Sequence, residues 1–227
     1  MDFELGEVLL VNKPLRWTSF DVVNKLRYAL KKRVGGKIKV GHAGTLDPLA
    51  TGLLIICTGK MTKKIDEFTG MDKEYTGSFF IGGTTATYDS ELEMDAVFST
   101  NHIDEKMLRD VAATFVGDIE QMPPIYSAIK IDGQAAYVAA RKGDEVIMKM
   151  RNVTIKEFEL TKIEMPLVYF RVVCSKGTYI RSLAYDYGKA LNSGAYLASL
   201  CRTKIGSFDV TNAKDVDAWV KEIQAPV

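Results

Sequence analysis

Short runs of apolar and β-branched residues recur along the chain and predict strands. Residues 7–12 (EVLLVN) and 74–81 (EYTGSFFI) are rich in such side chains, and residues 167–174 (LVYFRVVC) alternate as a strand does. The run 53–57 (LLIIC) is also apolar, but it is too short for its period to separate a buried strand from the start of a helix. We therefore expect three strands here, with the fourth segment left open.

Other segments show the spacing of apolar residues that is typical of amphipathic helices. The first helix is expected to begin at the N-cap Thr18, which has a capping-box-like spacing with Asp21, and to reach about Lys32. Two more are expected over 104–115 and 178–191. The apolar face of the last consists of Ile180, Leu183, Ala184, Tyr187 and Leu191.

The order of these segments predicts an α+β fold. Strands outnumber helices and do not alternate with them regularly, so a mixed or antiparallel sheet is expected rather than a doubly wound one. The 227 residues contain no internal repeat, low-complexity tract or Pro/Ser-rich linker. A hydrophobic fraction of 47% and a charged fraction of 26% are ordinary for a globular protein. We expect one continuous domain over residues 1–227.

Cysteine and histidine usage argues against a structural zinc site. Cys57, Cys174 and Cys201 are widely spaced and form no CxxC pair, and the two histidines are His42 and His102. Buried thiols in a reducing compartment are the expected state. The acidic N-terminus lacks the basic region of a signal peptide, and no apolar run approaches the roughly 20 residues of a membrane span. A cytoplasmic location is expected.

Charge is distributed unevenly, although the net charge is only +1. Residues 1–64 hold 12 Lys and Arg against 5 Asp and Glu, whereas the remainder holds 18 against 24. A basic first third is compatible with a nucleic acid partner, because clustered cations release counterions from a phosphate backbone. A basic solvated face is the alternative, since Lys31, Lys32 and Arg33 also suit the negative end of the first helix dipole.

The segment 41–52 (GHAGTLDPLATG) places a single carboxylate, Asp47, in a loop rich in glycine. Pro48 favours an extended backbone at Asp47, and Gly44 and Gly52 permit unusual dihedrals or the close approach of a ligand. An ionised Asp in this setting can act as a nucleophile or base, and a buried one needs a cationic partner. The alternative is an Asx turn that bonds its own loop. A phosphate-binding loop is the weaker interpretation, because the central acid would repel phosphate.

Together with other motifs, this segment resembles the catalytic motif of the TruB family of pseudouridine synthases. That motif commonly reads G-H-x-G-T/A-L-D-P-x-A-x-G, and the resemblance runs in order from about Gly6 to Trp219. The other matching segments are KPLRWTSFDVV (13–23), KEYTG (73–77), GDIEQMPPIYSAIKIDGQAAYVAARKG (117–143), CSKGTYIRSLAYDYG (174–188) and SGAYLASLCRTKIGSF (193–208).

The resemblance of these segments implies an enzyme that isomerises uridine to pseudouridine in the T-loop of tRNA, at tRNA position 55. It implies the pseudouridine synthase fold, with a central mixed, largely antiparallel sheet and with helices and loops around an RNA-binding cleft. It further implies no cofactor and no metal, the T-arm stem-loop of tRNA as partner, and a monomer. A stacked uridine is inaccessible, so the base would have to be flipped out.

Carried over position by position, the resemblance assigns the catalytic aspartate to Asp47, a tyrosine that packs on the target base to Tyr75, and an arginine that pairs with the aspartate to Arg181. Arg181 would keep Asp47 ionised and oriented. Tyr75 offers a ring for stacking and a hydroxyl for proton transfer. Without the resemblance, Tyr75 would be interpreted as a strand core residue and Arg181 as a solvated residue at a helix start.

The resemblance also indicates residues that contact RNA. His42 would fill the space left by the flipped base or hold the flipped loop, and its ring could stack on bases. Tyr179 would line the pocket, although by composition alone it would only cap a helix. The basic residues expected on the RNA backbone are Lys63, Lys64, Lys130 and Arg141.

Three positions depart from the family pattern. The usual glycine of KPxGxTS is Arg16, which changes the local geometry of that loop or adds a cation near the RNA. The segment 82–95 keeps Thr85, Thr87 and Asp89 of the family pattern, but Ala86 replaces an acid and Leu92 replaces a glycine. An insertion peculiar to this branch is expected at about 117–151, and no C-terminal PUA-like domain is expected. Recognition should then depend mainly on the T-arm.

Two other functions stay open at this point. A non-catalytic RNA-binding or tRNA-folding protein would keep the fold and the cleft without turnover. A nucleotide-binding enzyme would use the glycine-rich loop, and this is the weaker alternative. The presence of Asp47, Tyr75 and Arg181 together favours catalysis over binding alone.

Overall fold

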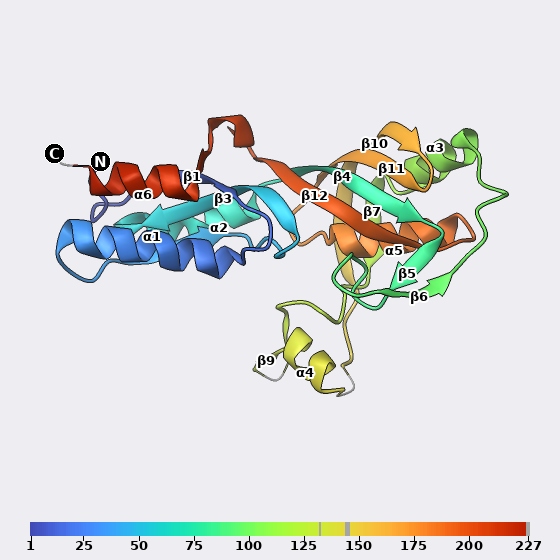
Figure 1. The fold of residues 1–227 in the computed structure, drawn as a ribbon, viewed down its shortest axis with the longest axis horizontal. Helices are drawn as coiled ribbons and strands as arrows, with labels where there is room; N and C mark the ends of the chain where they lie inside the picture. Colours follow the sequence, from blue (N-terminus) through green and yellow to red (C-terminus); the bar gives the residue numbers. More distant parts are fainter. Residues whose placement is uncertain (132, 144–145, 226–227) are drawn as a thin grey trace. The chain divides into compact units, whose positions relative to one another are not determined.

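The computed structural model describes residues 1–131, 133–143 and 146–225. The chain forms two compact units. The first unit consists of Met1–Thr76 and Leu200–Val227, and the second unit consists of Gly77–Ser199. The chain passes between them within two strands, β4 (Lys73–Ile81) and β12 (Ala195–Ile205) (Figure 1).

A mixed sheet forms the first unit. Besides parts of β4 and β12, its strands are β1 (Val8–Lys13), β2 (Val40–Ala43), β3 (Ala50–Thr58), β13 (Phe208–Asp209) and β14 (Lys214–Asp215). The strand order is β14–β1–β3–β12, with β2 also paired to β3. The pairs β1–β3 and β2–β3 are antiparallel, whereas β1–β14 and β3–β12 are parallel. The ambiguous run 53–57 lies within β3 and is therefore a strand.

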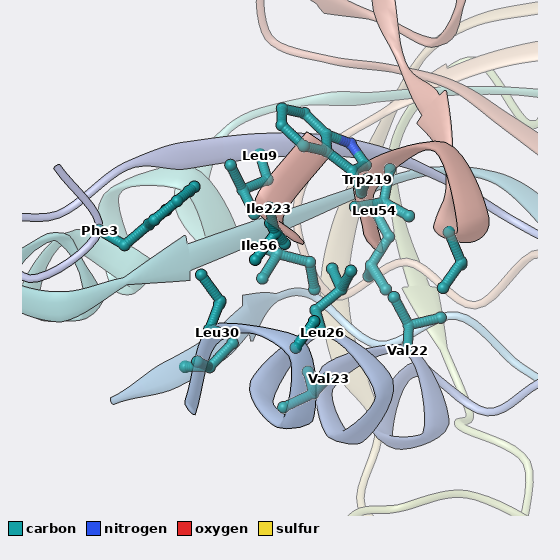
Figure 2. Packing of buried hydrophobic residues seen from close by; sticks show 14 residues of the cluster. Phe3, Leu9, Val22, Val23, Leu26, Leu30, Leu54, Ile56, Trp219 and Ile223 are labelled. Atoms are coloured by element: carbon teal, nitrogen blue, oxygen red, sulfur yellow. The ribbon is translucent and has the colours of Figure 1, made fainter. Parts of the chain in front are cut away.

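Helices cover both faces of this sheet. They are α1 (Ser19–Val34), α2 (Ile65–Gly70) and α6 (Val216–Gln224), with short 3-10 helices η1 (Gly59–Lys64) and η2 (Val210–Asn212). Leu54 and Ile56 of β3 join α1 and α6 in one apolar cluster, which Figure 2 shows with the apolar stripe of α1 directed at the strands. Leu53 and Ile55 join Phe68 of α2 in a second cluster, because successive strand residues point to opposite faces.

The first predicted helix is confirmed together with its capping box. The Thr18 hydroxyl accepts a hydrogen bond from the Asp21 N–H, and the Asp21 carboxylate accepts one from the Thr18 N–H. These two bonds satisfy donors that a helix start would otherwise leave unpaired. The helix continues to Val34, past the predicted end at about Lys32, and Gly35 follows it with φ +67°.

The second unit is also a sheet covered by helices. Besides parts of β4 and β12, its strands are β5 (Gly83–Thr85), β6 (Met94–Val97), β7 (Gly117–Gln121), β8 (Lys130–Ile131), β9 (Gln134–Ala135), β10 (Arg151–Glu164) and β11 (Leu167–Cys174). Its helices are α3 (Glu105–Thr114), α4 (Ala136–Lys142) and α5 (Ile180–Ala190). The order β4–β11–β10–β7 forms the main sheet, in which β10 is antiparallel to β11 and β7. The predicted α+β class with a mixed sheet is confirmed.

Aromatic packing forms the core of the second unit. Phe79 stacks on Phe170 with ring centroids 4.2 Å apart, and Tyr187 of α5 lies 5.7 Å from Phe79. The Tyr187 hydroxyl donates to the Leu108 carbonyl of α3 at 2.8 Å, so the buried hydroxyl is satisfied. All five residues predicted for the apolar face of α5 are buried. Of the helices in the described part of the chain, none is long and apolar enough to cross a membrane.

The insertion expected at about 117–151 contains β7, the β8–β9 hairpin and α4 (Figure 1). Residues 132, 144 and 145 of this segment lie outside the described residues. The thiols follow the prediction in part, because Cys57 and Cys174 are buried whereas Cys201 is partly exposed. Burial raises the pKa of the Cys57 thiol to about 11, which keeps it protonated at neutral pH.

Arg16, which stands where the family pattern has glycine, adopts φ +67°. This left-handed conformation costs a residue with a Cβ about 1–2 kcal/mol. The Arg16 N–H donates to the Pro48 carbonyl at 2.7 Å, and this bond ties the strained residue to the segment that follows Asp47. Arg16 therefore keeps the backbone conformation that glycine would adopt at this position, and the folded state bears the energetic cost of that conformation.

Replacing Arg16 by glycine is expected to raise the free energy of unfolding by about 0.5–1 kcal/mol. The free energy gained by relieving the left-handed strain in the folded state is larger than the free energy lost because glycine makes the unfolded chain more flexible. Urea denaturation measures the difference. Arg16→Ala removes the same charge but retains a Cβ, so it serves as the control and should show no such gain. Equal free energies of unfolding of Arg16→Gly and Arg16→Ala would contradict backbone strain at Arg16.

Candidate active site

The loop that carries Asp47 joins β2 to β3. Its backbone is left-handed at Gly44, with φ +86°, and the Asp47 carbonyl accepts a hydrogen bond from the Ala50 N–H at 3.0 Å. Ser19, the first residue of α1, fixes the loop from its buried side. The Ser19 hydroxyl donates to the Leu46 carbonyl at 3.2 Å and accepts from the Leu46 N–H at 2.8 Å. The half-buried Asp47 thus follows directly on an anchored residue.

A buried lysine contacts the same loop. Lys13, the last residue of β1, is 0% exposed. Its ammonium donates to the carbonyls of Trp17 at 2.6 Å, Pro14 at 3.0 Å and Pro48 at 3.4 Å. These bonds join the loop after β1 to the residue that follows Asp47. Burial lowers the pKa of Lys13 to about 8, while the negative charge of Asp47 opposes this shift and the positive charge of Arg202 adds to it.

The buried Lys13 predicts an unusual dependence of stability on pH. The folded protein binds this proton less tightly than the unfolded chain, whose lysine keeps a pKa near 10.5, so raising the pH from about 8 to 10.5 favours folding. The contribution is on the order of 3 kcal/mol. We expect the free energy of unfolding of the wild type, measured relative to Lys13→Met, to rise over this interval. A difference that does not change with pH would contradict a depressed pKa.

Arg202 is a second buried cation beside this loop. It lies in β12, opposite Gly52 of β3, and is 1% exposed. Its guanidinium donates through Nε to the Leu53 carbonyl at 2.8 Å, through Nη2 to the Gly44 carbonyl at 3.0 Å, and through Nη1 to the Thr45 carbonyl at 3.4 Å. Arg202 and Lys13 lie in segments that match the family pattern, but the sequence predicts no site role for either.

His42 lies in β2, opposite Ile56 of β3, and is partly buried. Burial is the main cause that lowers the pKa of His42, the positive charge of Arg202 lowers it further, and a hydrogen bond with the Gly44 backbone opposes the shift. The imidazole is therefore neutral at neutral pH, which suits stacking on a base. Among the described residues, no group of three or more His, Cys, Asp and Glu is placed to hold a metal ion.

Tyr75 lies in β4 within the first unit and is 8% exposed. Its neighbour Glu74 accepts a hydrogen bond from the hydroxyl of Thr203 on β12 at 2.8 Å. Strand pairing and burial thus fix the backbone that carries Tyr75. The same burial fits a core ring and a ring that packs on a target base, so its catalytic role stays a prediction.

Arg181 belongs to the first turn of α5 and is 4% exposed, unlike a solvated arginine at a helix start. Its guanidinium donates to the carbonyls of Thr87 at 3.1 Å and Tyr126 at 3.0 Å. The Arg181 Nε lies 3.7 Å from Oδ2 of Asp89, which is also buried. The Asp89 carboxylate in turn accepts a hydrogen bond from the Thr87 hydroxyl at 2.7 Å. Asp89 is a retained residue of the family pattern, but nothing in the sequence identifies it as a partner of Arg181.

In the segment 82–95, the residues that keep the family pattern are buried, whereas the two that depart from it are exposed. Thr85, Thr87 and Asp89 are buried, and the Thr85 hydroxyl donates to the Asp89 carbonyl at 2.7 Å. Ala86 and Leu92, the two positions that depart from the family pattern, are exposed. The departures therefore leave the hydrogen bonds that support Arg181 intact.

The predicted catalytic and RNA-binding residues lie in both units. Asp47, Tyr75 and His42 belong to the first unit, whereas Arg181 and Tyr179 belong to the second. The pairing of Arg181 with Asp47 stays a prediction.

Tyr179 is the N-cap residue of α5, but its side chain makes no capping hydrogen bond. Its backbone is held by Gln121, whose amide accepts from the Tyr179 N–H at 2.8 Å and donates to the Tyr179 carbonyl at 3.1 Å. The guanidinium of Arg151 lies 5.8 Å from the centre of the Tyr179 ring. The ring therefore does not serve as a cap, which was the alternative to a pocket-lining role.

The basic residues predicted to contact RNA are all exposed. Lys63 and Lys64 lie in η1, Lys130 in β8 and Arg141 in α4. Lys63 also lines a surface pocket with Lys37, Lys39 and Lys60. Arg141 is paired at 2.5 Å with Glu91, so its charge is already partly neutralised in the free protein.

A family model described as "TruB family pseudouridylate synthase (N terminal domain)" matches residues 31–180. A protein of Flavobacterium johnsoniae named tRNA pseudouridine synthase B is 58% identical over 221 residues, which cover 96% of each chain. A protein of the same name from Parabacteroides distasonis is 56% identical over 207 residues, which cover 91% of this chain and 88% of that one.

Two solved structures contain chains whose fold is similar to that of this chain. A chain in the "Crystal Structure of a Cbf5-Nop10-Gar1 Complex" matches with a TM-score of 0.67 and 30% identity, over 91% of this chain. A chain in the "Structure of H/ACA RNP bound to a substrate RNA containing 2'-deoxyuridine" matches with a TM-score of 0.69 and 26% identity, over 96% of this chain. This chain spans 50% and 53% of their lengths. By its match to the family model and its identity to full-length relatives, the chain belongs to the TruB family of pseudouridylate synthases.

Proposed function

We propose that this chain isomerises uridine to pseudouridine in the T-loop of tRNA, at tRNA position 55. Its relatives along nearly the whole chain carry the name tRNA pseudouridine synthase B. The observation that carries the proposal is the loop 41–52, whose single carboxylate stands on a main chain held by Lys13, Ser19 and Arg202. A reactive carboxylate needs such fixed support, because small errors of position cost large factors in rate.

The reaction exchanges one bond to the ribose for another. The N-glycosidic bond of uridine breaks, the uracil turns, and a C–C bond forms to the same ribose. The uracil carbon that forms the new C–C bond loses a proton, and the uracil nitrogen that is released from the ribose gains one. Substrate and product are isomers, so the step is neither an oxidation nor a reduction, and we propose no cofactor.

Asp47 is the proposed catalytic residue. Its carboxylate either attacks the sugar covalently or stabilises the positive charge that develops there when the glycosidic bond breaks. Arg181 is proposed to orient the ionised carboxylate through charge-assisted hydrogen bonds. Tyr75 is proposed to pack on the target base and to relay the proton through its hydroxyl.

Access to the base requires that the uridine leave the stacked T-loop, which costs a few kcal/mol. We propose that His42 occupies the vacated space, and its neutral imidazole supports this role, because a neutral ring stacks without desolvating a charge. Tyr179 is proposed to line the pocket. The exposed residues Lys63, Lys64, Lys130 and Arg141 are proposed to contact the phosphates of the T-arm. The working state is proposed to be a cytoplasmic monomer.

The test is incubation of the protein with unmodified tRNA and with an isolated T-arm stem-loop, followed by chromatographic scoring of pseudouridine at each position. We expect product at position 55 with both RNAs. Absence of product at good RNA occupancy would reject the enzyme and leave an RNA-binding or tRNA-folding protein. Product in intact tRNA but not in the stem-loop would reject recognition through the T-arm alone.

A further inference from the structure

We infer that Arg202 is a positioning residue for Asp47, whose guanidinium fixes the main chain on both sides of the reactive carboxylate. The inference rests on the proposed role of Asp47. Two of the carbonyls that Arg202 binds, those of Gly44 and Thr45, precede Asp47, and the third, that of Leu53, follows it. One side chain therefore joins the entry and the exit of the loop.

The shape of guanidinium explains why arginine occupies this position. Its donors point outward in a rigid plane, so three carbonyls from separate parts of the chain can be bound at once. A lysine ammonium has the same charge but no such fork. The contact with Leu53 at 2.8 Å and that with Gly44 at 3.0 Å have the usual length of N–H···O bonds, whereas that with Thr45 at 3.4 Å is long.

The main chain of Arg202 also lies close to the end of the Asp47 loop. Arg202 pairs with Gly52 in the parallel β3–β12 ladder. Gly52 has φ +102°, and a Cβ at this position would lie 2.3 Å from the Arg202 carbonyl oxygen and 2.7 Å from the Arg202 nitrogen. Gly52 is therefore required where β12 approaches the end of the Asp47 loop. This close approach of the two strands brings the Arg202 guanidinium within hydrogen-bond distance of the Gly44 carbonyl.

The charge of Arg202 is a second argument for function. A strand contact alone would be made at lower cost by an apolar side chain, because a buried cation loses its hydration. Here the cation is 1% exposed. It lies close enough to Lys13 that the two repel, and Lys13 is at the same time attracted by Asp47. Two buried cations thus bind the main chain of the segment that carries one carboxylate.

The test compares Arg202→Lys and Arg202→Met with the wild type in single-turnover pseudouridine formation at saturating protein. We expect the rate to fall about 10-fold for Arg202→Lys and about 100-fold for Arg202→Met, because loss of loop geometry misplaces the carboxylate. The RNA dissociation constant, measured by filter binding, should change by less than about threefold, since Arg202 is too deeply buried to contact RNA. Arg202→Lys retains the charge and is the variant that carries the test if Arg202→Met does not fold.

Leu30→Ala is the matched control for stability. Leu30 is 0% exposed in the core of the same unit, on α1, and its truncation destabilises the fold without touching the loop. All rates are measured well below the unfolding midpoint of each variant. A slow Arg202→Lys beside a Leu30→Ala of wild-type rate supports the inference. Equal rates in Arg202→Lys and Leu30→Ala would overturn it, while an active Asp47→Asn would instead reject the proposed role of Asp47.

Discussion

Asp47→Asn is expected to lower the single-turnover rate of pseudouridine formation by about 10⁴-fold or more, the range seen when an essential nucleophile is removed. An amide has nearly the same shape as a carboxylate, but it can neither attack the sugar nor stabilise positive charge on it. The loop should keep its conformation, because its main chain is held by Ser19, Lys13 and Arg202. The loss should therefore lie in the chemical step alone.

Two measurements separate this loss from a folding or binding defect. The dissociation constant for the T-arm stem-loop should stay within about threefold of the wild type, and the urea midpoint should be nearly unchanged. Asp66→Asn, at an exposed aspartate of α2 in the same unit, makes the same change of charge and should keep full activity. Activity in Asp47→Asn close to that of Asp66→Asn would remove Asp47 from the mechanism.

Asp89→Asn is expected to lower the free energy of unfolding by about 3 kcal/mol, because it removes a countercharge from the buried Arg181. The amide oxygen of the substituted side chain can still accept the hydrogen bond that the Thr87 hydroxyl now donates to Asp89 Oδ1. The loss would therefore report the charge rather than the shape of the side chain. Asp95→Asn, whose exposed carboxylate accepts from the Thr84 hydroxyl, should change stability by less than about 0.5 kcal/mol.

A double-mutant cycle tests whether Asp89 and Arg181 act together. Because removal of either charge leaves the other less compensated, Asp89→Asn/Arg181→Met should cost less than the sum of the two single variants. Urea denaturation of the four proteins gives the coupling energy, expected at about 1–3 kcal/mol. Additive losses would show that the buried pair is not coupled. The cycle also predicts that each single variant loses activity, because Arg181 is the proposed partner of Asp47.

Several elements followed directly from local sequence. The capping box of Thr18 and Asp21 was predicted and is present, since both of its bonds join residues in one helical turn. The apolar face of α5 was predicted from spacing, because the 3.6-residue period alone decides which side chains share a face. The run 53–57 could not be assigned in this way. Strand partners outside the run decided it, because β1 pairs with residues 53–57 and β2 pairs with residues 55–57 on the other side.

The supports of the candidate site were harder to predict. Lys13 did carry a local signal, because Leu9, Val11 and Lys13 alternate onto the buried face of β1. Nothing local marked Arg202 as buried, since its role depends on a parallel pairing with Gly52 that joins residues far apart in sequence.

By itself the sequence determined three of the helices (α1, α3 and α5), three of the strands (β1, β4 and β11), the α+β class and the family, and it named Asp47 as the candidate catalytic residue. These follow from periodicity, capping and motifs, which are properties of neighbouring residues. Only the tertiary structure decided that Arg16 holds a left-handed backbone, that Arg181 is buried against Asp89, and that buried cations bind the loop of Asp47. Burial and pairing of charges depend on where distant strands meet, and no local pattern contains that information.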